Sequence, residues 1–309
     1  VASPMNTVVR TASSTIESSA FGMMGNASAT STKTTSVFTM KPITITFIWG
    51  AAIGVFLFST TQPATVAWLR AAAGALVLVV WRRPWRMPLT RRRVVIATVF
   101  GLITVGMNIA FYEALARIPL GTAVAVEFIG PTLVATLGSR RPRDIAAAVL
   151  AAGGVALLAG IEFTSELAGV VWALVAAALW AGYVLVGKRV ADTHGGLDTL
   201  ALGLSTAALI LGPVIVLLQA HANAAVFLDP RTWMLGVGVG LLSTAIPYAL
   251  DQIVLRQVGQ ARFAILLALL PVTAAVIGLT VLDQIPTVGE IAGIGLVVAG
   301  LLLGARGAP

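Results

Sequence analysis

The chain has 309 residues, of which 58% are hydrophobic and only 10% are charged, and its mean hydropathy is +0.96. A soluble domain carries about 25% charged residues, so this composition excludes a soluble enzyme of ordinary polar surface. The net charge of +8 fits Lys and Arg in the cytoplasmic loops of a membrane protein better than a nucleic-acid partner, and the lack of cysteine excludes disulfides and thiolate metal sites.

The first segment, residues 1–42, is rich in Ser, Thr and Ala and has almost no aliphatic clusters. No apolar core of a signal peptide precedes residue 43. A segment of this composition cannot bury enough apolar surface to order itself. We therefore expect a disordered cytoplasmic tail, with a targeting segment as the alternative.

Apolar runs fill most of the remaining chain, and each is close to the length that crosses about 30 Å of hydrocarbon as a helix. They do not alternate with polar residues as barrel strands do. The sequence therefore predicts an all-α membrane protein with ten transmembrane helices. The runs lie near residues 43–60, 63–81, 94–115, 120–138, 144–161, 168–187, 199–219, 232–252, 262–281 and 287–304.

The distribution of positive charge tests this topology. With a cytoplasmic N-terminus, ten spans leave Arg117 and Arg231 outside and Arg70 within a span, and the other seventeen of the 20 Lys and Arg residues fall on the cytoplasmic side. Cytoplasmic loops are enriched in Lys and Arg. We therefore expect both termini to be cytoplasmic.

The two halves of the chain repeat weakly. Residues 115–160 match residues 255–300 at a constant offset of 140 without a gap, and Pro131 aligns with Pro271. Because each half has five spans, the second half would enter the membrane from the opposite side. Inverted repeats are typical of secondary transporters with a site between the halves; a duplicated channel or scaffold is the alternative.

Glu127 lies about seven residues into a predicted span, too deep for its short side chain to reach an interface. Pro131 has no N–H, so the carbonyl of residue 127 loses its helical partner, and Gly130 loosens the backbone further. We interpret this segment as a helix break that carries a substrate-amine or proton site. The alternative is a structural Glu bonded to a neighbouring helix.

Four more residues within spans are candidates for binding. Arg70 could neutralise Glu127 or bind a carboxylate, or it could extend to a lipid headgroup. Asn108 and Tyr112 share one helix face and could line a cavity or bond between helices. Tyr183 is a candidate too, although an aromatic residue at mid-span more often serves packing.

In the second half, Pro247 frees the carbonyl of Ser243, and Tyr248 follows it. A broken helix with hydroxyls and a tyrosine is typical of a cavity lining, but a tolerated proline kink is the alternative. Pro271 and Pro247 are therefore predicted hinges alongside Gly130 and Pro131.

Several segments closely resemble the bacterial threonine/homoserine exporter family of the drug/metabolite transporter superfamily. They are Gly106–Tyr112, Ile118–Phe128, Gly130-Pro131, Ser139–Pro142 and Leu242–Tyr248. The resemblance covers about residues 43–304. It implies two EamA-type five-helix repeats, 43–161 and 168–304, followed by a cytoplasmic tail at 305–309.

The resemblance also implies a function: export of small neutral amino acids through the bacterial inner membrane, driven by proton exchange. Glu127 and Pro131 match the family's Glu-Phe-x-Gly-Pro motif. The sequence departs where Leu270 precedes Pro271, and where Asp283-Gln284 replaces a common Gly-Glu pair. These departures put an ionisable site there in doubt and concentrate the expectation on Glu127.

We therefore expect an antiporter with alternating access, in which a substrate ammonium pairs with Glu127 and its carboxylate with Arg70 or a helix N-terminus. The expected partners are a small molecule, protons and the bilayer, with no enzymatic activity, cofactor, metal or nucleic acid; a homodimer is left open. The alternatives are export of another metabolite or a lipophilic drug, and a scaffold that does not transport.

Overall fold

The computed structural model describes residues 54–55, 57–86, 89–137, 141–162, 166–191, 196–245 and 270–305. The expected N-terminal tail, most of the first predicted span, and Pro247 and Tyr248 lie outside these residues. The described residues belong to one compact unit, Met40–Pro309.

The described part of the chain is helical and contains no β-strand. Its α-helices are α3 (Pro63–Arg82), α4 (Arg91–Leu115), α5 (Leu120–Glu127), α6 (Ile129–Leu137), α7 (Pro142–Glu162), α8 (Leu167–Ala191), α9 (Gly196–Asn223), α10 (Pro230–Gly240), α13 (Leu270–Val281) and α14 (Val288–Ala305). Short turns of other helix types are η1 (Leu57–Ser59), η2 (Pro84–Arg86), η3 (Ala224–Leu228) and the π-helical turn η4 (Leu241–Ala245).

Four helical segments are long and apolar enough to cross a membrane: Pro63–Arg82, Arg91–Leu115, Leu167–Gly187 and Gly196–Leu228. Shorter apolar helical segments are Leu120–Val134, Leu270–Val281 and Val288–Gly304. This confirms an all-α protein of membrane character.

Two predicted spans differ from a continuous α-helix. The run predicted near 120–138 is divided between α5 and α6, and the run predicted near 232–252 changes from α10 to π-helical winding at Leu241. Both changes occur next to polar residues inside an otherwise apolar sequence. Local changes of winding of this kind often accompany functional sites.

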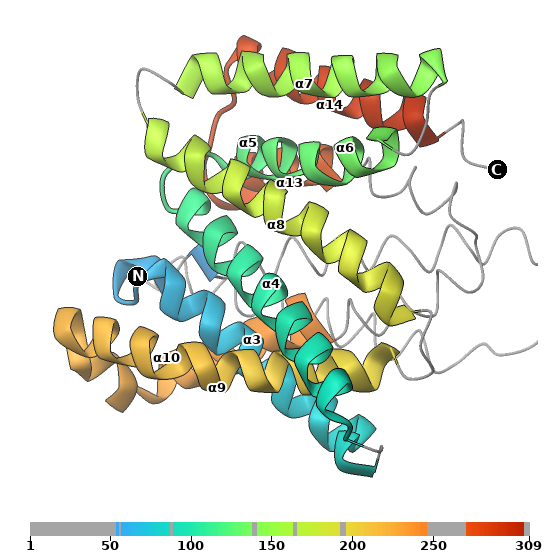
Figure 1. Ribbon diagram of the computed structural model, residues 1–309. Coiled ribbons are helices and arrows are strands. Elements are labelled where there is room, and N and C mark those ends of the chain that lie inside the picture. Colours follow the sequence, from blue (N-terminus) through green and yellow to red (C-terminus); the bar gives the residue numbers. More distant parts are fainter. Residues whose placement is uncertain are drawn as a thin grey trace, which may run out of the picture. The chain divides into compact units, whose positions relative to one another are not determined.

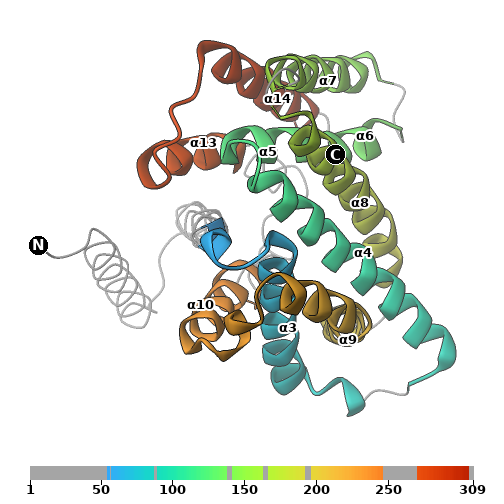
Figure 2. The ribbon, with the colours of Figure 1, turned by 90° about the vertical axis from the view of Figure 1, so that its left-hand side faces the viewer.

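The main helix contacts join segments that are far apart in the sequence. α7 packs along α14, α4 against α8 and α9, α3 against α9 and α10, and α5 against α13 (Figure 1). Figure 2 shows from a second direction that α3 and α10 lie together and that α5 lies beside α13. Helices before residue 163 are therefore packed mainly against helices after residue 166.

Small residues allow some of these close contacts. A Cβ added to Gly101 in α4 would collide with the carbonyl oxygen of Gly203 in α9. Apolar side chains gain little by leaving lipid for another apolar surface, so close backbone packing is a main source of attraction between membrane helices. The α4–α9 contact therefore depends on the absence of a side chain at Gly101.

Candidate functional site

The break between α5 and α6 places Glu127 inside the protein. α5 ends at Glu127, Phe128 has αR geometry, and α6 begins at Ile129. The Glu127 residue is 6% exposed. Because an isolated carboxylate inside an apolar core is costly, Glu127 either pairs with a cation or holds a proton.

The residues that follow Glu127 pack against α8. The Phe128 ring meets the Trp180 ring edge to face, with centroids 4.7 Å apart and planes at 72°. A Cβ at Gly130 would collide with the Ala177 carbonyl oxygen. The segment is thus packed closely against α8, which restricts the positions that Glu127 can take.

Arg70 is the cationic group of this region. It lies in α3, is 1% exposed, and is within electrostatic range of Glu127. Its Nε donates to Thr244 Oγ1 and its Nη2 donates to the Ser243 carbonyl oxygen, both at 3.0 Å. Arg70 is therefore held inside the protein by η4 rather than extended to a headgroup.

Ser243 takes part through its backbone. Because Pro247 has no N–H, the Ser243 carbonyl is expected to lack a helical partner. In the structure this carbonyl accepts a hydrogen bond from Arg70. The Ser243 hydroxyl donates to Val239 O at 2.7 Å, within its own segment. The π-helical turn thus offers Arg70 a backbone oxygen and the neighbouring threonine hydroxyl.

Tyr112 completes a polar group that draws on three helices. Its residue is fully buried in α4, and Arg70 Cζ lies 5.5 Å from the centre of its ring. Arg70 and Glu127 are each seven residues from the start of their helices, Pro63 and Leu120, or about 10 Å along each axis at 1.5 Å per residue. We call Arg70, Tyr112 and Glu127 the central polar cluster.

Other predicted site residues lie elsewhere. Asn108 is buried and its Nδ2 donates to Thr104 O at 2.8 Å, within α4. The Tyr183 ring stacks on Phe100 with centroids 4.9 Å apart. Pro131 is half-buried in α6, and Pro271 is buried near the start of α13. The described contacts of Asn108 and Tyr183 thus run to Thr104 and Phe100.

A second polar group, which the sequence analysis missed, joins α5 to α14. Thr122 Oγ1 donates to Glu290 Oε1 at 3.2 Å, and both residues are buried. Glu290 Oε2 also accepts from Thr287 N at 2.6 Å, and Thr287 Oγ1 accepts from Glu290 N at 3.2 Å. Thr287-x-x-Glu290 is a capping box, which is a signal readable from the sequence.

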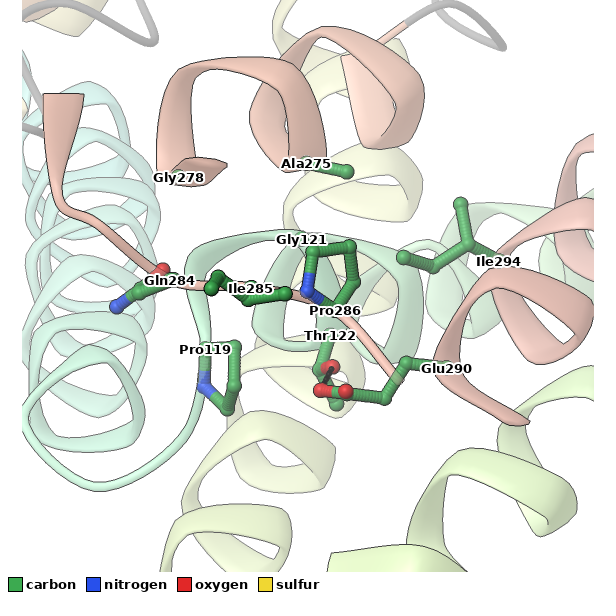
Figure 3. A pocket seen from close by; sticks show the side chains of 10 residues that line it. All are labelled: Pro119, Gly121, Thr122, Ala275, Gly278, Gln284, Ile285, Pro286, Glu290 and Ile294. Carbon is green, nitrogen blue, oxygen red and sulfur yellow. Dashed lines mark hydrogen bonds between the residues drawn. The ribbon is translucent and has the colours of Figure 1, made fainter. Parts of the chain in front are cut away.

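A small cavity lies beside this second group. Its volume is about 20 Å³, enough for a single water. Figure 3 shows Thr122 and Glu290 approaching each other across it, with Gln284 on the connector between α13 and α14. Gln284 Oε1 accepts from Leu120 N at 3.0 Å and thereby caps α5 from outside its own helix.

The N-terminus of α3 is capped in the same way. Gln219 Oε1 accepts from Gln62 N at 2.9 Å, and Glu113 Oε1 accepts from Ala64 N at 3.2 Å. Neither α3 nor α5 receives a cap from the side chain of its own N-cap residue. Because the first N–H groups of a helix have no partner within it, these side chains link the starts of α3 and α5 to other parts of the chain: α9, α4 and the connector between α13 and α14.

Charge of both signs and hydrogen-bonding groups together suit the binding of a polar, zwitterionic molecule better than bond-breaking chemistry. The central polar cluster supplies a guanidinium, a carboxyl group and a phenol, each from a different helix. A guanidinium recognises carboxylates, and a carboxylate recognises ammonium groups. Buried ionisable groups at membrane depth commonly mark substrate or proton pathways.

Comparisons with known proteins point the same way. The EamA-like transporter family matches residues 167–305. The threonine/homoserine exporter RhtA of Escherichia coli (strain K12) is 36% identical over 253 residues, which cover 81% of this chain and 84% of that protein. RhtA of Salmonella typhimurium (strain SL1344) is 37% identical over 238 residues, covering 76% and 79%.

A likeness in structure accompanies the likeness in sequence. A protein of known crystal structure superposes with a TM-score of 0.56 at 20% identity, covering 87% of this chain and 99% of that one. This second likeness concerns the fold alone.

Proposed function

The chain belongs to the family of the threonine/homoserine exporter RhtA, and from this premise we propose that it exports threonine, homoserine or similar neutral amino acids from the cytoplasm by proton antiport. Its relatives are transporters, and its apolar helices fit a multi-pass protein of the bacterial inner membrane. The observation that carries the proposal is the central polar cluster, buried where an apolar core would otherwise be expected.

In the proposed mechanism the cluster binds both charges of an amino acid. The substrate carboxylate pairs with Arg70 and its ammonium pairs with Glu127, so that one bound molecule neutralises both buried groups. When substrate leaves, Glu127 takes up a proton, because an unpaired carboxylate in this environment is costly. Substrate and proton thus compete for one carboxyl group, which is the basis of exchange.

The proposed topology is ten transmembrane helices in two inverted five-helix repeats, 43–161 and 168–304, with both termini cytoplasmic. The family match to residues 167–305 supports the second repeat. The contacts of α3, α4, α5 and α7 with helices of the second half support a site enclosed by both repeats. The positive-inside distribution of Lys and Arg supports the orientation.

In this orientation the starts of α3 and α5 face the outside. The caps from Gln219, Glu113 and Gln284, and the Thr122–Glu290 bond, then join different segments of the chain at their outer ends. We propose that these links close the outer side, so that this conformation is loaded from the cytoplasm. Export then requires that they open, as alternating access demands.

The test is transport in proteoliposomes. Purified protein is reconstituted with labelled threonine inside, a proton gradient is imposed, and efflux is measured. We expect Glu127→Gln to lose gradient-driven flux by ten-fold or more, because the amide carries no charge to pair with the ammonium and takes up no proton. Glu166→Gln, an exposed carboxyl before α8, is the matched control and should keep wild-type flux.

The outcomes separate the hypotheses. Full flux in Glu127→Gln rejects the proposed role of that carboxyl group. No threonine flux in the wild-type protein rejects the substrate, and competition by a panel of metabolites and lipophilic cations then identifies another class. A protein that neither binds nor moves any member of the panel is a scaffold.

A further inference from the structure

The phenol oxygen of Tyr112 lies in the core with no hydrogen-bond partner among the described residues. The whole residue is 0% exposed, so water does not serve it from the surface. Leaving such a group unpaired costs free energy that an apolar side chain of the same shape would not. Buried polar groups without a partner are rare in folded proteins, and each requires an explanation.

Packing accounts for the ring but not for its hydroxyl group. The ring meets Phe58 edge to face with centroids 5.9 Å apart, and Phe111 with centroids 6.2 Å apart. A Cβ at Gly54 would lie 2.6 Å from Tyr112 Cε1 and 2.9 Å from its hydroxyl oxygen, so the ring is tightly enclosed on that side. Phenylalanine would make all of these contacts without an unpaired oxygen.

The neighbouring cation does not account for the hydroxyl group either. Arg70 Cζ lies 5.5 Å from the Tyr112 ring centre, which is the distance of a cation–π contact. That attraction depends on the face of the ring, and phenylalanine supplies such a face too. Two nitrogens of the Arg70 guanidinium donate to Ser243 and Thr244. The hydroxyl group is therefore beside the substrate-binding charge but has no described structural task.

We propose that the Tyr112 hydroxyl group binds the side-chain hydroxyl of the transported amino acid and so makes the exporter selective for hydroxylated substrates. This inference rests on the proposed function. A phenol both donates and accepts a hydrogen bond, as does an alcohol. Arg70, Glu127 and Tyr112 then recognise the carboxylate, the ammonium and the hydroxyl group from three different helices.

This geometry makes selectivity testable with one compound. 2-Aminobutyrate is the form of both threonine and homoserine in which hydrogen replaces the hydroxyl group. It keeps both charges, so it can satisfy Arg70 and Glu127, but it leaves the phenol unpaired. A site that offers a hydrogen bond to a substrate hydroxyl discriminates strongly against an analogue without one.

The experiment compares threonine and 2-aminobutyrate in proteoliposomes containing wild-type protein or Tyr112→Phe. We expect the wild type to prefer threonine in kcat/KM, and Tyr112→Phe to reduce that preference by about ten-fold or more, since one buried hydrogen bond is lost. Thr65→Val is the matched control, because it removes another buried, unpartnered hydroxyl from the described core. Thr65 lies about 140° round α3 from Arg70. The Thr65→Val protein should therefore keep the wild-type preference for threonine over 2-aminobutyrate.

A second measurement distinguishes binding from a structural role. The melting temperature of the purified, unliganded Tyr112→Phe protein should equal or exceed that of the wild type, because no described bond is broken. Added threonine should raise the melting temperature of the wild type more than that of the variant. A lower melting temperature in the unliganded variant means that the hydroxyl group has a structural partner and overturns the inference.

The remaining outcomes are also decisive. A wild-type protein that moves neither amino acid rejects the proposed function, and the inference with it. A wild-type protein that prefers threonine, with the same preference in Tyr112→Phe, rejects the inference and leaves the proposed function intact. An equal loss of preference in Thr65→Val shows that any lost buried hydroxyl has this effect, and rejects the inference as well.

Discussion

The bond between Thr122 and Glu290 gives the most direct test of how the outer side is closed. It joins α5 to α14 at 3.2 Å, and the two residues are 1% and 4% exposed. Thr122→Val removes this bond while keeping the shape of the side chain, and Glu290 keeps its bond from Thr287 N at 2.6 Å. A hydrogen bond to a charged group contributes about 1.5 kcal/mol or more, so the open state should become about ten-fold more populated.

The natural absence of cysteine makes this measurable. Ala275→Cys places a single thiol in the lining of the small cavity beside Thr122. A membrane-impermeant maleimide added from outside should label it about ten-fold faster in the Thr122→Val background. Thr104→Val is the control, since the bond from Thr104 Oγ1 to Phe100 O at 2.7 Å stays within α4.

The result that refutes this reasoning is a labelling rate that is the same in the Thr122→Val and Thr104→Val backgrounds. In that case the bond does not hold the outer side closed. Labelling that occurs only when the reagent is inside contradicts the proposed orientation instead. The two failures are therefore separable in one series of measurements.

Two further predictions concern packing and charge. Gly101→Ala should lower the melting temperature of the purified protein, because the added Cβ collides with the Gly203 backbone; Gly153→Ala, a helix position with open space, should leave it unchanged or raise it slightly. Arg70→Lys should weaken threonine binding by about ten-fold or more in a titration, because an ammonium cannot reproduce the planar pair of donors that would bind the substrate carboxylate. Arg82→Lys, at an exposed ion pair, should bind as the wild type does, and equal affinities in both variants would contradict the role of the guanidinium.

The sequence was informative wherever one segment carried the whole signal. Apolar runs predict α3 and α9 closely, because length and hydropathy are local properties. The segment that contains Glu127 and Pro131 predicts the division between α5 and α6 for a similar reason. Proline has no N–H, so the helical hydrogen bond to the carbonyl four residues earlier is missing. The free carbonyl of Ser243 follows from the same rule, although its partner does not.

Partners across the bundle could not be predicted from local signals. Arg70 and Thr244 are 174 positions apart, and only the packing of α3 against η4 brings them together. The sequence directs attention to Asp283 and Gln284 after α13 and gives no ionisable site there. The structure places the buried side chain of Glu290 near that connector. A capping box marks Glu290 as a local helix start, but nothing in that pattern indicates the bond to Thr122.

The partners of Arg70 suggest how substrate binding in one half of the protein can affect the other half. Among its partners are a threonine hydroxyl and a backbone carbonyl in η4, which are both neutral acceptors. A carboxylate is a stronger acceptor for a guanidinium than either, because both partners then carry charge and the pair is frequently bidentate. A substrate carboxylate that binds Arg70 therefore competes with η4 on favourable terms, and each bond it takes releases a contact between α3 and the second half. Because η4 departs from α-helical winding, as backbone at functional sites often does, we expect movement of this turn to transmit that exchange.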